Sequence, residues 1–273
     1  MSGAEAVPQE LSPARIGELL RSRRFGRSIE VVALTDSTND DARAAATRGV
    51  PDGHVVVADA QRSGRGSQGR SWASPPGLDL YLSIVARPAL SLSQLPPLTL
   101  AVGLGVAEAA EALTAKAPRP GQSRVKWPND VWIDGRKCAG ILVEATSVGE
   151  ALQALVVGIG LNVNRSHWPE QLRDRATSLK LASESPTPLD RAVALCRTLE
   201  AVERWIDNLV EHGSAAVARA VDQRLLWRDQ RVRCDRIEGE LLGVADSGAL
   251  RIATAAGMRE LVAGQLVAID DHD

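Results

Sequence analysis

RVKWPNDVWIDGRKCAGILVEAT, residues 124–146, is the stretch on which the fold prediction rests. Two apolar runs flank the Asp-Gly pair at 134–135, a dipeptide typical of a tight hairpin turn. The segment therefore predicts two antiparallel strands joined at that turn. Such a hairpin would return Lys137 to the neighbourhood of Asn129 and Asp130, and so bring an amine, an amide and a carboxylate together.

Periodic segments on both sides of this hairpin predict further helices and strands. Helices are expected where apolar residues recur with helical spacing, and strands where short runs are rich in Val, Ile and Leu. The expected helices span residues 12–24, 36–49, 96–116, 188–210 and about 214–226, and the expected strands span 30–35, 54–59, 80–87 and 154–164. The pattern changes at Trp227, because short alternating runs split by glycine follow from about 230 to 269. The prediction is a mixed α/β domain followed by a small antiparallel β-barrel.

Composition excludes several classes of protein. The 273 residues carry a formal net charge of -2, so no global positive field favours nucleic acid. The N-terminus lacks the basic start and apolar run of a signal peptide, and no apolar run approaches the roughly 18 residues of a membrane span. Cys138, Cys196 and Cys234 are scattered and have no histidine at metal-ligand spacing. We therefore expect a cytoplasmic protein without a disulfide framework or a zinc site.

Asp36-Ser37-Thr38-Asn39 forms a polar cluster between a predicted strand and a predicted helix. These are the residue types preferred at helix N-caps, so capping of the helix is one explanation for the cluster. Hydroxyl and amide groups beside a helix N-terminus can also bind a small polar ligand. The cluster alone leaves both interpretations open.

SGRGSQGRSW, residues 63–72, is a glycine-rich basic loop. Glycine lets the backbone approach a ligand closely, and arginine adds charge-assisted hydrogen bonds to phosphate oxygens. The same composition suits a solvated surface loop or an RNA-binding Arg-Gly segment, although the motif is not repeated and the chain is slightly acidic. The loop alone does not decide among the three.

The order and spacing of these clusters are specific where each cluster alone is not. The motifs are Ser-Thr-Asn at 37–39, Gln61 leading into GRGSQGRSW, KWPND at 126–130 joined to GRKCAGILVE at 135–144, and GIGLNVN at 158–164. Together they resemble the catalytic domain of biotin protein ligases. The resemblance covers about residues 30 to 180, and the final β segment resembles the small C-terminal domain of that family.

The resemblance implies an α+β fold, with a mixed β-sheet flanked by helices, of the class II aminoacyl-tRNA-synthetase-like or biotin–lipoate ligase type. It implies a catalytic domain at 1–226, with its core at about 28–210, and an SH3-like β-barrel at 227–273. Some members add an N-terminal winged helix-turn-helix that binds DNA, and the roughly 30 residues before the first predicted strand are too few for one. We therefore expect the monofunctional form, with no DNA and no membrane as partner, and either a monomer or a homodimer.

The resemblance also implies a reaction in two steps. The carboxylate of biotin attacks the α-phosphate of ATP, with Mg²⁺ present, and yields biotinyl-5′-AMP and pyrophosphate. A lysine amine on a biotin carboxyl carrier protein of an acyl-CoA carboxylase then takes the biotinyl group and releases AMP. The expected ligands are biotin, ATP and Mg²⁺, and the expected partner is the carrier protein.

Residues that match the family motifs carry the implied roles. Lys137, Arg65 and Asp130 are the implied catalytic residues, with Lys137 nearest the acyl-phosphate and Asp130 as the candidate Mg²⁺ ligand. The implied contacts to biotin or the adenylate are Ser37, Thr38, Asn39, Gln61, Gly64, Arg65, Gly66, Ser67, Arg70, Trp72, Lys126, Asn129, Lys137, Gly140 and Asn162. In this set Trp72 covers the adenylate, Asn162 contacts the nucleotide and Lys126 contacts a phosphate. Val55, Val57, Leu82 and Ile84 are the candidate apolar walls.

Two other readings compete with this one. Lipoate and octanoyl transferases have a related fold, but they use a different glycine-rich signature and lack KWPND joined to the GRK-AGILVE pattern. A non-catalytic vitamin-binding or DNA-regulatory protein would have lost the phosphate machinery or gained a DNA-reading module. Lys137, Arg65 and Asp130 are all present, and this favours the ligase.

The loop departs from the family pattern at Ser67-Gln68, where the common motif GRGRxGRxW has a further arginine. We predict that the adenylate is held less tightly here, unless Arg70 or closure from elsewhere recovers the grip. Substituting Ser67→Arg is then expected to slow the release of biotinyl-5′-AMP, because a guanidinium would again face the phosphate. Release is measured by separating free adenylate from the protein over time, and equal rates for the two proteins would refute the idea.

Overall fold

The computed structural model describes residues 8–117, 122–148 and 151–269. Its larger sheet has seven strands in the order β1-β2-β3-β7-β6-β5-β4. The strands are β1 (Ile29–Thr35), β2 (His54–Gln61), β3 (Leu80–Ala86), β4 (Ser123–Lys126), β5 (Asp130–Ile133), β6 (Arg136–Val148) and β7 (Ala151–Leu161). β1 pairs with β2 in parallel and the remaining neighbours are antiparallel, so the sheet is mixed as predicted.

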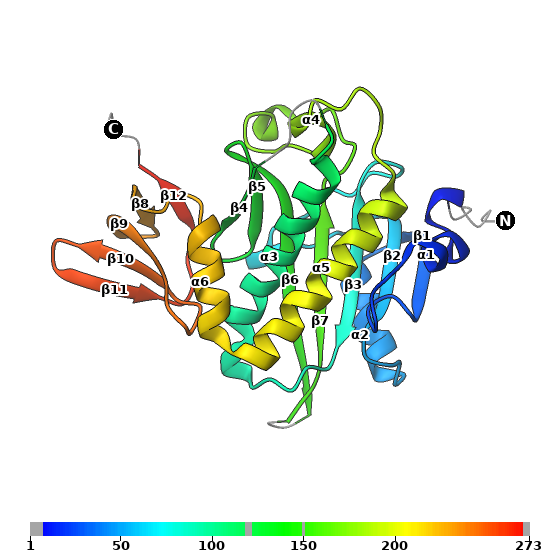
Figure 1. Ribbon diagram of the computed structural model, residues 1–273, viewed down its shortest axis with the longest axis horizontal. Coiled ribbons are helices and arrows are strands. Elements are labelled where there is room, and N and C mark those ends of the chain that lie inside the picture. Colours follow the sequence, from blue (N-terminus) through cyan, green and yellow to red (C-terminus); the bar gives the residue numbers. More distant parts are fainter. Residues whose placement is uncertain (1–7, 118–121, 149–150, 270–273) are drawn as a thin grey trace.

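Helices cover both faces of this sheet (Figure 1). The α-helices are α1 (Pro13–Leu19), α2 (Thr38–Thr47), α3 (Leu95–Thr114), α4 (Leu179–Ala182), α5 (Arg191–His212) and α6 (Ser214–Arg224). Single 3₁₀ turns lie at Gln9–Leu11, Ser67–Gly69, Leu92–Gln94 and Glu170–Leu172. The long helices α3 and α5 pack against each other and share one apolar core with the sheet. α2 packs against β2, β3 and β7.

Side-chain alternation along the strands separates the two faces. Val55 and Val57 of β2 belong to the core beneath α3 and α5, whereas Val56 packs with Ala42 of α2. In β7, Val157 faces the α3–α5 core, whereas Val156 packs with Ala42 of α2 and Gly158 lies against Asn39 of α2. Because successive side chains of a strand point to opposite faces, each run buries both of its faces. This explains why these strands read as continuous apolar runs.

The segment 124–146 forms three strands, and the prediction of two was wrong. The break falls at Pro128, which cannot donate a ladder hydrogen bond and follows a cis peptide bond after Trp127. The second turn lies where predicted, at 134–135, with both residues at positive φ. The extra turn places Lys126 directly across from Asp130 in the β4–β5 pairing.

The predicted helix 12–24 ends early, since α1 stops at Leu19 and Leu20 is already extended. The chain after it bonds to α5 and does not continue the helix. The backbone amides of Arg23, Arg24 and Phe25 all donate to the carboxylate of Glu203, each at 2.8 Å. A buried carboxylate that accepts three amides is a strong competitor for helical hydrogen bonds.

A second sheet of five antiparallel strands follows α6 (Figure 1). Its strands are β8 (Arg231–Cys234), β9 (Ile237–Val244), β10 (Leu250–Thr254), β11 (Gly257–Leu261) and β12 (Leu266–Ala268), in the order β11-β10-β9-β8-β12. This is consistent with the expected SH3-like unit. The sheet is tied to the larger one because the indole of Trp127 donates to the carbonyl of Gly248 at 2.9 Å.

Within the described residues, one helical stretch, Leu92–Thr114, is long and apolar enough to cross a membrane by length and composition. Its most apolar window is 72% buried inside the fold, where α3 packs on α5 and the sheet. The apolar character of this helix is therefore accounted for by core packing.

The Glu203 contact predicts a measurable share of the stability. Glu203→Ala should lower the free energy of unfolding by about 2–4 kcal/mol, because one buried and two partly buried amide donors lose their acceptor. Urea denaturation followed by circular dichroism measures this change. Glu211→Ala is the control, since Glu211 is exposed on the same helix. A loss no larger than that of the control would contradict this role.

Candidate functional site

The centre of the site is a patch of bare backbone on β6 and β7. Gly140 pairs with Gly160 across the two strands, and Gly158 lies two residues earlier in β7. A Cβ added at Gly160 would lie 2.4 Å from the Trp72 indole, and one at Gly158 would lie 2.2 Å from Asn39 Oδ1. Both distances are too short for a methyl group. These positions must be glycine for the surrounding side chains to lie against the sheet.

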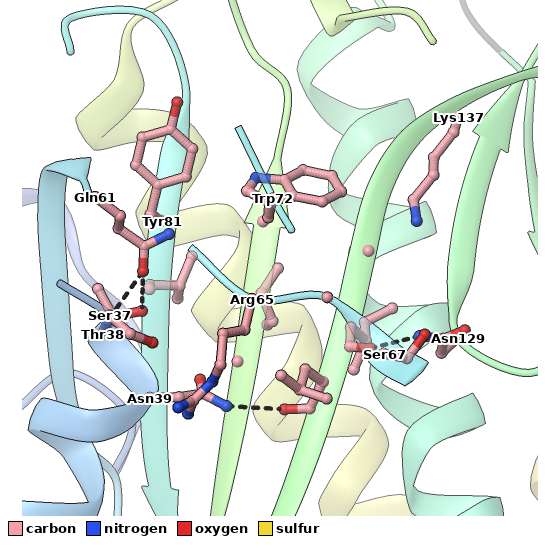
Figure 2. A pocket seen from close by; sticks show the side chains of 18 residues that line it. Ser37, Thr38, Asn39, Gln61, Arg65, Ser67, Trp72, Tyr81, Asn129 and Lys137 are labelled. Carbon is pink, nitrogen blue, oxygen red and sulfur yellow. Dashed lines mark hydrogen bonds between the residues drawn. The ribbon is translucent and has the colours of Figure 1, made fainter. Parts of the chain in front are cut away.

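Trp72 lies on this bare patch, and the loop 63–72 holds it there. The loop folds back on itself, since Trp72 N donates to Gly64 O at 2.7 Å and Gly66 N donates to Arg70 O at 2.6 Å. Figure 2 shows the indole across the central strands, with Gln61 and Tyr81 to one side of it and Lys137 to the other. The loop thus divides the space above the sheet into two parts.

Hydroxyl and amide side chains form one wall. Thr38 donates to Gln61 Oε1 through its backbone N at 2.9 Å and through its hydroxyl at 3.2 Å, as Figure 2 shows. Ser83 donates to both Thr38 Oγ1 and Asn39 Oδ1. Ser37 is the N-cap residue of α2, yet its side chain makes no capping hydrogen bond. The cluster therefore equips a cavity, and side-chain capping does not explain it.

Arg65 is held by two carboxylates in this structure. Its guanidinium lies 2.9 Å from Asp40 Oδ1 and 3.3 Å from Glu144 Oε2. Glu144 also accepts from Asn39 Nδ2 at 2.7 Å and pairs with Arg43 at 2.9 Å. The implied phosphate-neutralising residue is thus already paired, and an anionic ligand would have to compete with both carboxylates.

Lys137 and Asp130 form an ion pair at the other side of Trp72. Lys137 Nζ lies 2.6 Å from Asp130 Oδ1 and 5.3 Å from the centroid of the Trp72 ring. Asn129 lies beside them, with Nδ2 donating to Ile141 O at 2.8 Å. The three groups that the predicted hairpin was expected to collect do lie together. They lie together because only a few residues separate them in the chain and the turn at 134–135 brings β6 back beside β5.

The ammonium group of Lys126 lies against two indole rings. Its Nζ is 4.8 Å from the centroid of Trp132 and 5.3 Å from that of Trp227, which begins the C-terminal segment. Burial lowers the pKa of Lys126, Asp130 opposes that shift, and the positive charges of Lys137, Arg175 and Arg70 add to it. These four cationic side chains and the carboxylate of Asp130 line the same space. Such a cluster is suited to several phosphate charges.

Two cavities meet at this point. Cavity 1 lies over the glycine patch beside Thr38, Asn39 and Gln61 and has a volume of about 40 Å³. Cavity 2 lies on the side of Lys126, Asp130 and Asn162 and has a volume of about 360 Å³. Four residues line both cavities, and they are Gly66, Ser67, Trp72 and Lys137. With Trp72 seated on the glycines, cavity 1 is far below the ~300 Å³ of a typical ligand pocket, so a ligand there requires Trp72 to move.

Unpaired buried polar atoms concentrate in the wall of cavity 2. Trp72 Nε1, Trp132 Nε1, Trp168 Nε1 and Asn162 Oδ1 are all buried without a hydrogen-bond partner in the described structure. Buried polar groups are normally satisfied, so a set of unpaired donors and an unpaired acceptor around one cavity indicates a polar ligand. The structure brings three donors, one acceptor and the cationic cluster to the same wall.

Most of the residues predicted from the sequence line these cavities. Ser37, Thr38, Asn39, Gln61, Arg65, Gly66, Ser67, Trp72, Asn129, Lys137 and Gly140 line cavity 1, and Arg70, Lys126, Asp130 and Asn162 line cavity 2. Gly64 lines neither, because it lies beneath the carbonyl of Trp72. Of the expected apolar walls only Leu82 reaches cavity 1; Val55, Val57 and Ile84 belong to the core beneath α3 and α5.

Sequence reasoning missed several residues of the site. Tyr81, Trp132, Arg165, Trp168 and Arg175 line the cavities, and Ser83 and Glu144 complete the hydrogen-bond network. Most of them lie outside the recognised motifs. Glu144 ends one of those motifs, and its polar side chain at an otherwise apolar strand position was the available signal.

The close approach at Gly160 predicts how the loop responds to a change in the sheet. Gly160→Ala should unseat Trp72, because the added methyl would overlap the indole. Hydrogen–deuterium exchange of residues 64–72 should then be faster. Gly103→Ala is the control, since a Cβ there meets its nearest neighbour at an ordinary 3.6 Å. Unchanged exchange in the loop of Gly160→Ala would contradict the seating of Trp72.

Comparisons with known proteins agree with this site. Residues 31–162 match the model of the Biotin/lipoate A/B protein ligase family. The biotin–[acetyl-CoA-carboxylase] ligase of Mycobacterium tuberculosis is 35% identical over 252 residues, which cover 88% of this chain and 89% of that protein. The biotin protein ligase of Aquifex aeolicus, solved in complex with biotin and ATP, is similar with a TM-score of 0.75 and 30% identity, covering 88% of this chain and 98% of the other.

The ligase of Leishmania major, solved in complex with biotinyl-5-AMP, is similar with a TM-score of 0.58 and 26% identity, covering 87% of this chain and 99% of the other. The similarities therefore extend over most of the chain, and the family match spans the strands and loops that build both cavities. The chain belongs to the biotin/lipoate A/B protein ligase family.

Proposed function

We propose that this enzyme attaches biotin to a lysine of a biotin carboxyl carrier protein, through biotinyl-5′-AMP as the intermediate. The observation that carries the proposal is the junction of the two cavities at Lys137 and Trp72. An acid bound in one cavity and a nucleotide bound in the other would meet at that junction. The names of the relatives support biotin and ATP as the two substrates.

Cavity 1 suits the biotin head group once Trp72 moves. The bare backbone at Gly140, Gly158 and Gly160 offers a flat floor for an apolar bicycle. The wall of Thr38 and Asn39 has hydroxyl and amide groups for the ureido head, which both donates and accepts. A few polar groups in an otherwise apolar slot fix the orientation of the bound ligand.

Cavity 2 suits the nucleotide, because its wall carries the cationic cluster around Lys126 and unpaired donors. An oxygen of the biotin carboxylate attacks the α-phosphorus, the bond to the bridging oxygen breaks, and pyrophosphate leaves. Lys137, which lines both cavities, stabilises the charge that develops between the two reactants. Asp130 keeps this ammonium in place through their ion pair.

The second step transfers the biotinyl group. The lysine amine of the carrier attacks the acyl carbon, the carbon–oxygen bond to phosphate breaks, and AMP leaves with the bonding electrons. The amine loses a proton in the process. The loop that carries Trp72 borders both cavities, so once Trp72 has left the glycine patch the loop can cover the bound adenylate and keep water from the acyl-phosphate between the two steps.

Mg²⁺ belongs to the proposal and fits the residues present. In the described part of the chain no group of three or more His, Cys, Asp or Glu residues could hold a metal ion. Mg²⁺ is commonly bound through one or two carboxylates together with substrate phosphates. Asp130 is the carboxylate that lines cavity 2, so it would share the ion with bound phosphates. The ion would supply charge neutralisation there.

The remaining parts of the proposal concern organisation and partners. We propose a catalytic domain at 1–226 and an SH3-like domain at 227–273, supported by the change from the large sheet to the second sheet after α6. The carrier would belong to an acyl-CoA carboxylase, as the name of the Mycobacterium tuberculosis relative suggests. The net charge of -2 supports an enzyme that does not use DNA as a partner. The three free cysteines support a reducing, cytoplasmic location.

Pyrophosphate release tests the proposal directly. Incubation with MgATP and biotin should release pyrophosphate, and incubation with MgATP and lipoate should not. Lys137→Ala should reduce the rate by about 100-fold or more, as expected when a stabiliser of developing charge is removed. Lys180→Ala is the control, because Lys180 lines neither cavity. Signal with lipoate alone would make the enzyme a lipoate ligase, and no signal with either acid would refute adenylation.

A further inference from the structure

Arg165 is a buried arginine in the wall of cavity 2, on the irregular segment after β7. It is 5% exposed, and Asp79 beside it is fully buried. Arg165 Nε donates to Asp79 Oδ2 at 2.7 Å, and Asp79 Oδ1 accepts from Val163 N at 2.9 Å. A buried ion pair persists only where such additional hydrogen bonds satisfy both partners.

The same guanidinium joins two separate parts of the wall. Its Nη2 donates at 2.8 Å to the carbonyl of Ala73, the residue directly after Trp72. Its Cζ lies 4.6 Å from the ring centroid of Trp168. One rigid planar group thus fixes the end of the loop and the position of an indole. A lysine could supply the charge but not this combination of contacts.

Arg165 differs from the other cations of cavity 2. Lys126, Lys137, Arg70 and Arg175 line cavity 2 around the carboxylate of Asp130, whereas Arg165 is paired with a different, fully buried carboxylate. The charge of Arg165 is neutralised by Asp79 at 2.6 Å. The cluster around Lys126 is therefore suited to phosphates, whereas the wall at Arg165 is suited to an uncharged part of the ligand.

The groups near Arg165 along the chain match a purine base. Trp168 presents a flat aromatic ring, and its Nε1 is a buried donor without a partner in the described structure. Asn162, three residues before Arg165, presents Oδ1 as an unpaired buried acceptor. A stacking surface, a donor and an acceptor are what a base with ring nitrogens and an exocyclic amine requires.

We propose that Arg165 is a positioning residue for the nucleotide, which holds the Trp168 indole as the stacking surface for the base and anchors the loop at Ala73. The inference rests on the proposed function only in taking ATP as the occupant of cavity 2. Trp168 and Ala73 both line cavity 2 and not cavity 1, so loss of the Arg165 contacts should raise the KM for ATP more than the KM for biotin.

Arg165→Lys tests this, because it keeps a positive charge beside Asp79 and removes the planar group. The KM for ATP should rise about tenfold, while the KM for biotin and kcat stay within about twofold, since a cation–π contact and a hydrogen bond are lost at the nucleotide end alone. Arg191→Lys is the matched control. Arg191 is 2% exposed and pairs with Asp59 at 2.6 Å, but it lines neither cavity. The Arg191→Lys variant should have a lower Tm than the wild type and the same KM for ATP.

A double-mutant cycle with Trp168→Leu distinguishes an effect of Arg165 through Trp168 from a general loss of folded structure. Because both residues act on one contact, the double variant should raise the KM for ATP no more than the larger single effect. Effects that multiply would overturn the proposal, as would an equal rise in both KM values for Arg165→Lys. If Arg165→Lys does not fold, Trp168→Leu alone decides, because an unchanged KM for ATP in that variant would remove the stacking surface from the argument.

The outcome for the wild type separates this inference from the proposed function. Absence of pyrophosphate release by the wild type with biotin would refute the ligase reaction. Calorimetric titration with MgATP would then give the Kd of each variant without any turnover. A Kd for ATP that is unchanged in folded Arg165→Lys would overturn the inference, and a Kd that rises about tenfold would support it.

Discussion

The close approach of side chains to bare backbone on β6 and β7 is the constraint on which the whole site depends. Trp72 can lie on the sheet only because Gly140 and Gly160 have no side chains, and Asn39 can reach β7 only because residue 158 is glycine. A single methyl group at either β7 position would overlap these neighbours. The loop, the polar wall and the boundary between the two cavities all follow from this patch of backbone.

Ionic contacts set the resting state of the charged groups around this patch. Arg65 is paired with Asp40 and Glu144, and Lys137 is paired with Asp130, so in the described structure neither cation is free of carboxylate partners. An anionic substrate would therefore exchange one set of partners for another. Such exchange costs less than bringing a fully hydrated cation into a closed cavity, because the groups are already held in place and partly desolvated.

The sequence predicted the components of the site better than their arrangement. The family motifs identified most of the polar residues that line cavity 1 and fewer of those that line cavity 2. They did not predict that Arg65 pairs with Glu144, or that Arg165 and Trp168 form part of the second wall. These contacts join residues far apart in the chain, and a periodicity or a local motif has no information on such pairs. The helix predicted at 12–24 failed for the same reason, since Glu203 of α5 captures its amides.

The sequence by itself determined the mixed sheet, the turn at 134–135 that returns Lys137 to Asp130, and the family to which the chain belongs. The turn depends on local backbone preferences and the family on motif spacing, both of which a linear pattern contains, and the mixed sheet was predicted from the resemblance to that family. Only the tertiary structure decided that Trp72 sits on the glycine patch and divides the space above it into two cavities that meet at Lys137. That division arises from the close packing of β6 and β7 against a loop more than sixty residues earlier in the chain, and such packing is defined only when the strands are placed side by side in space.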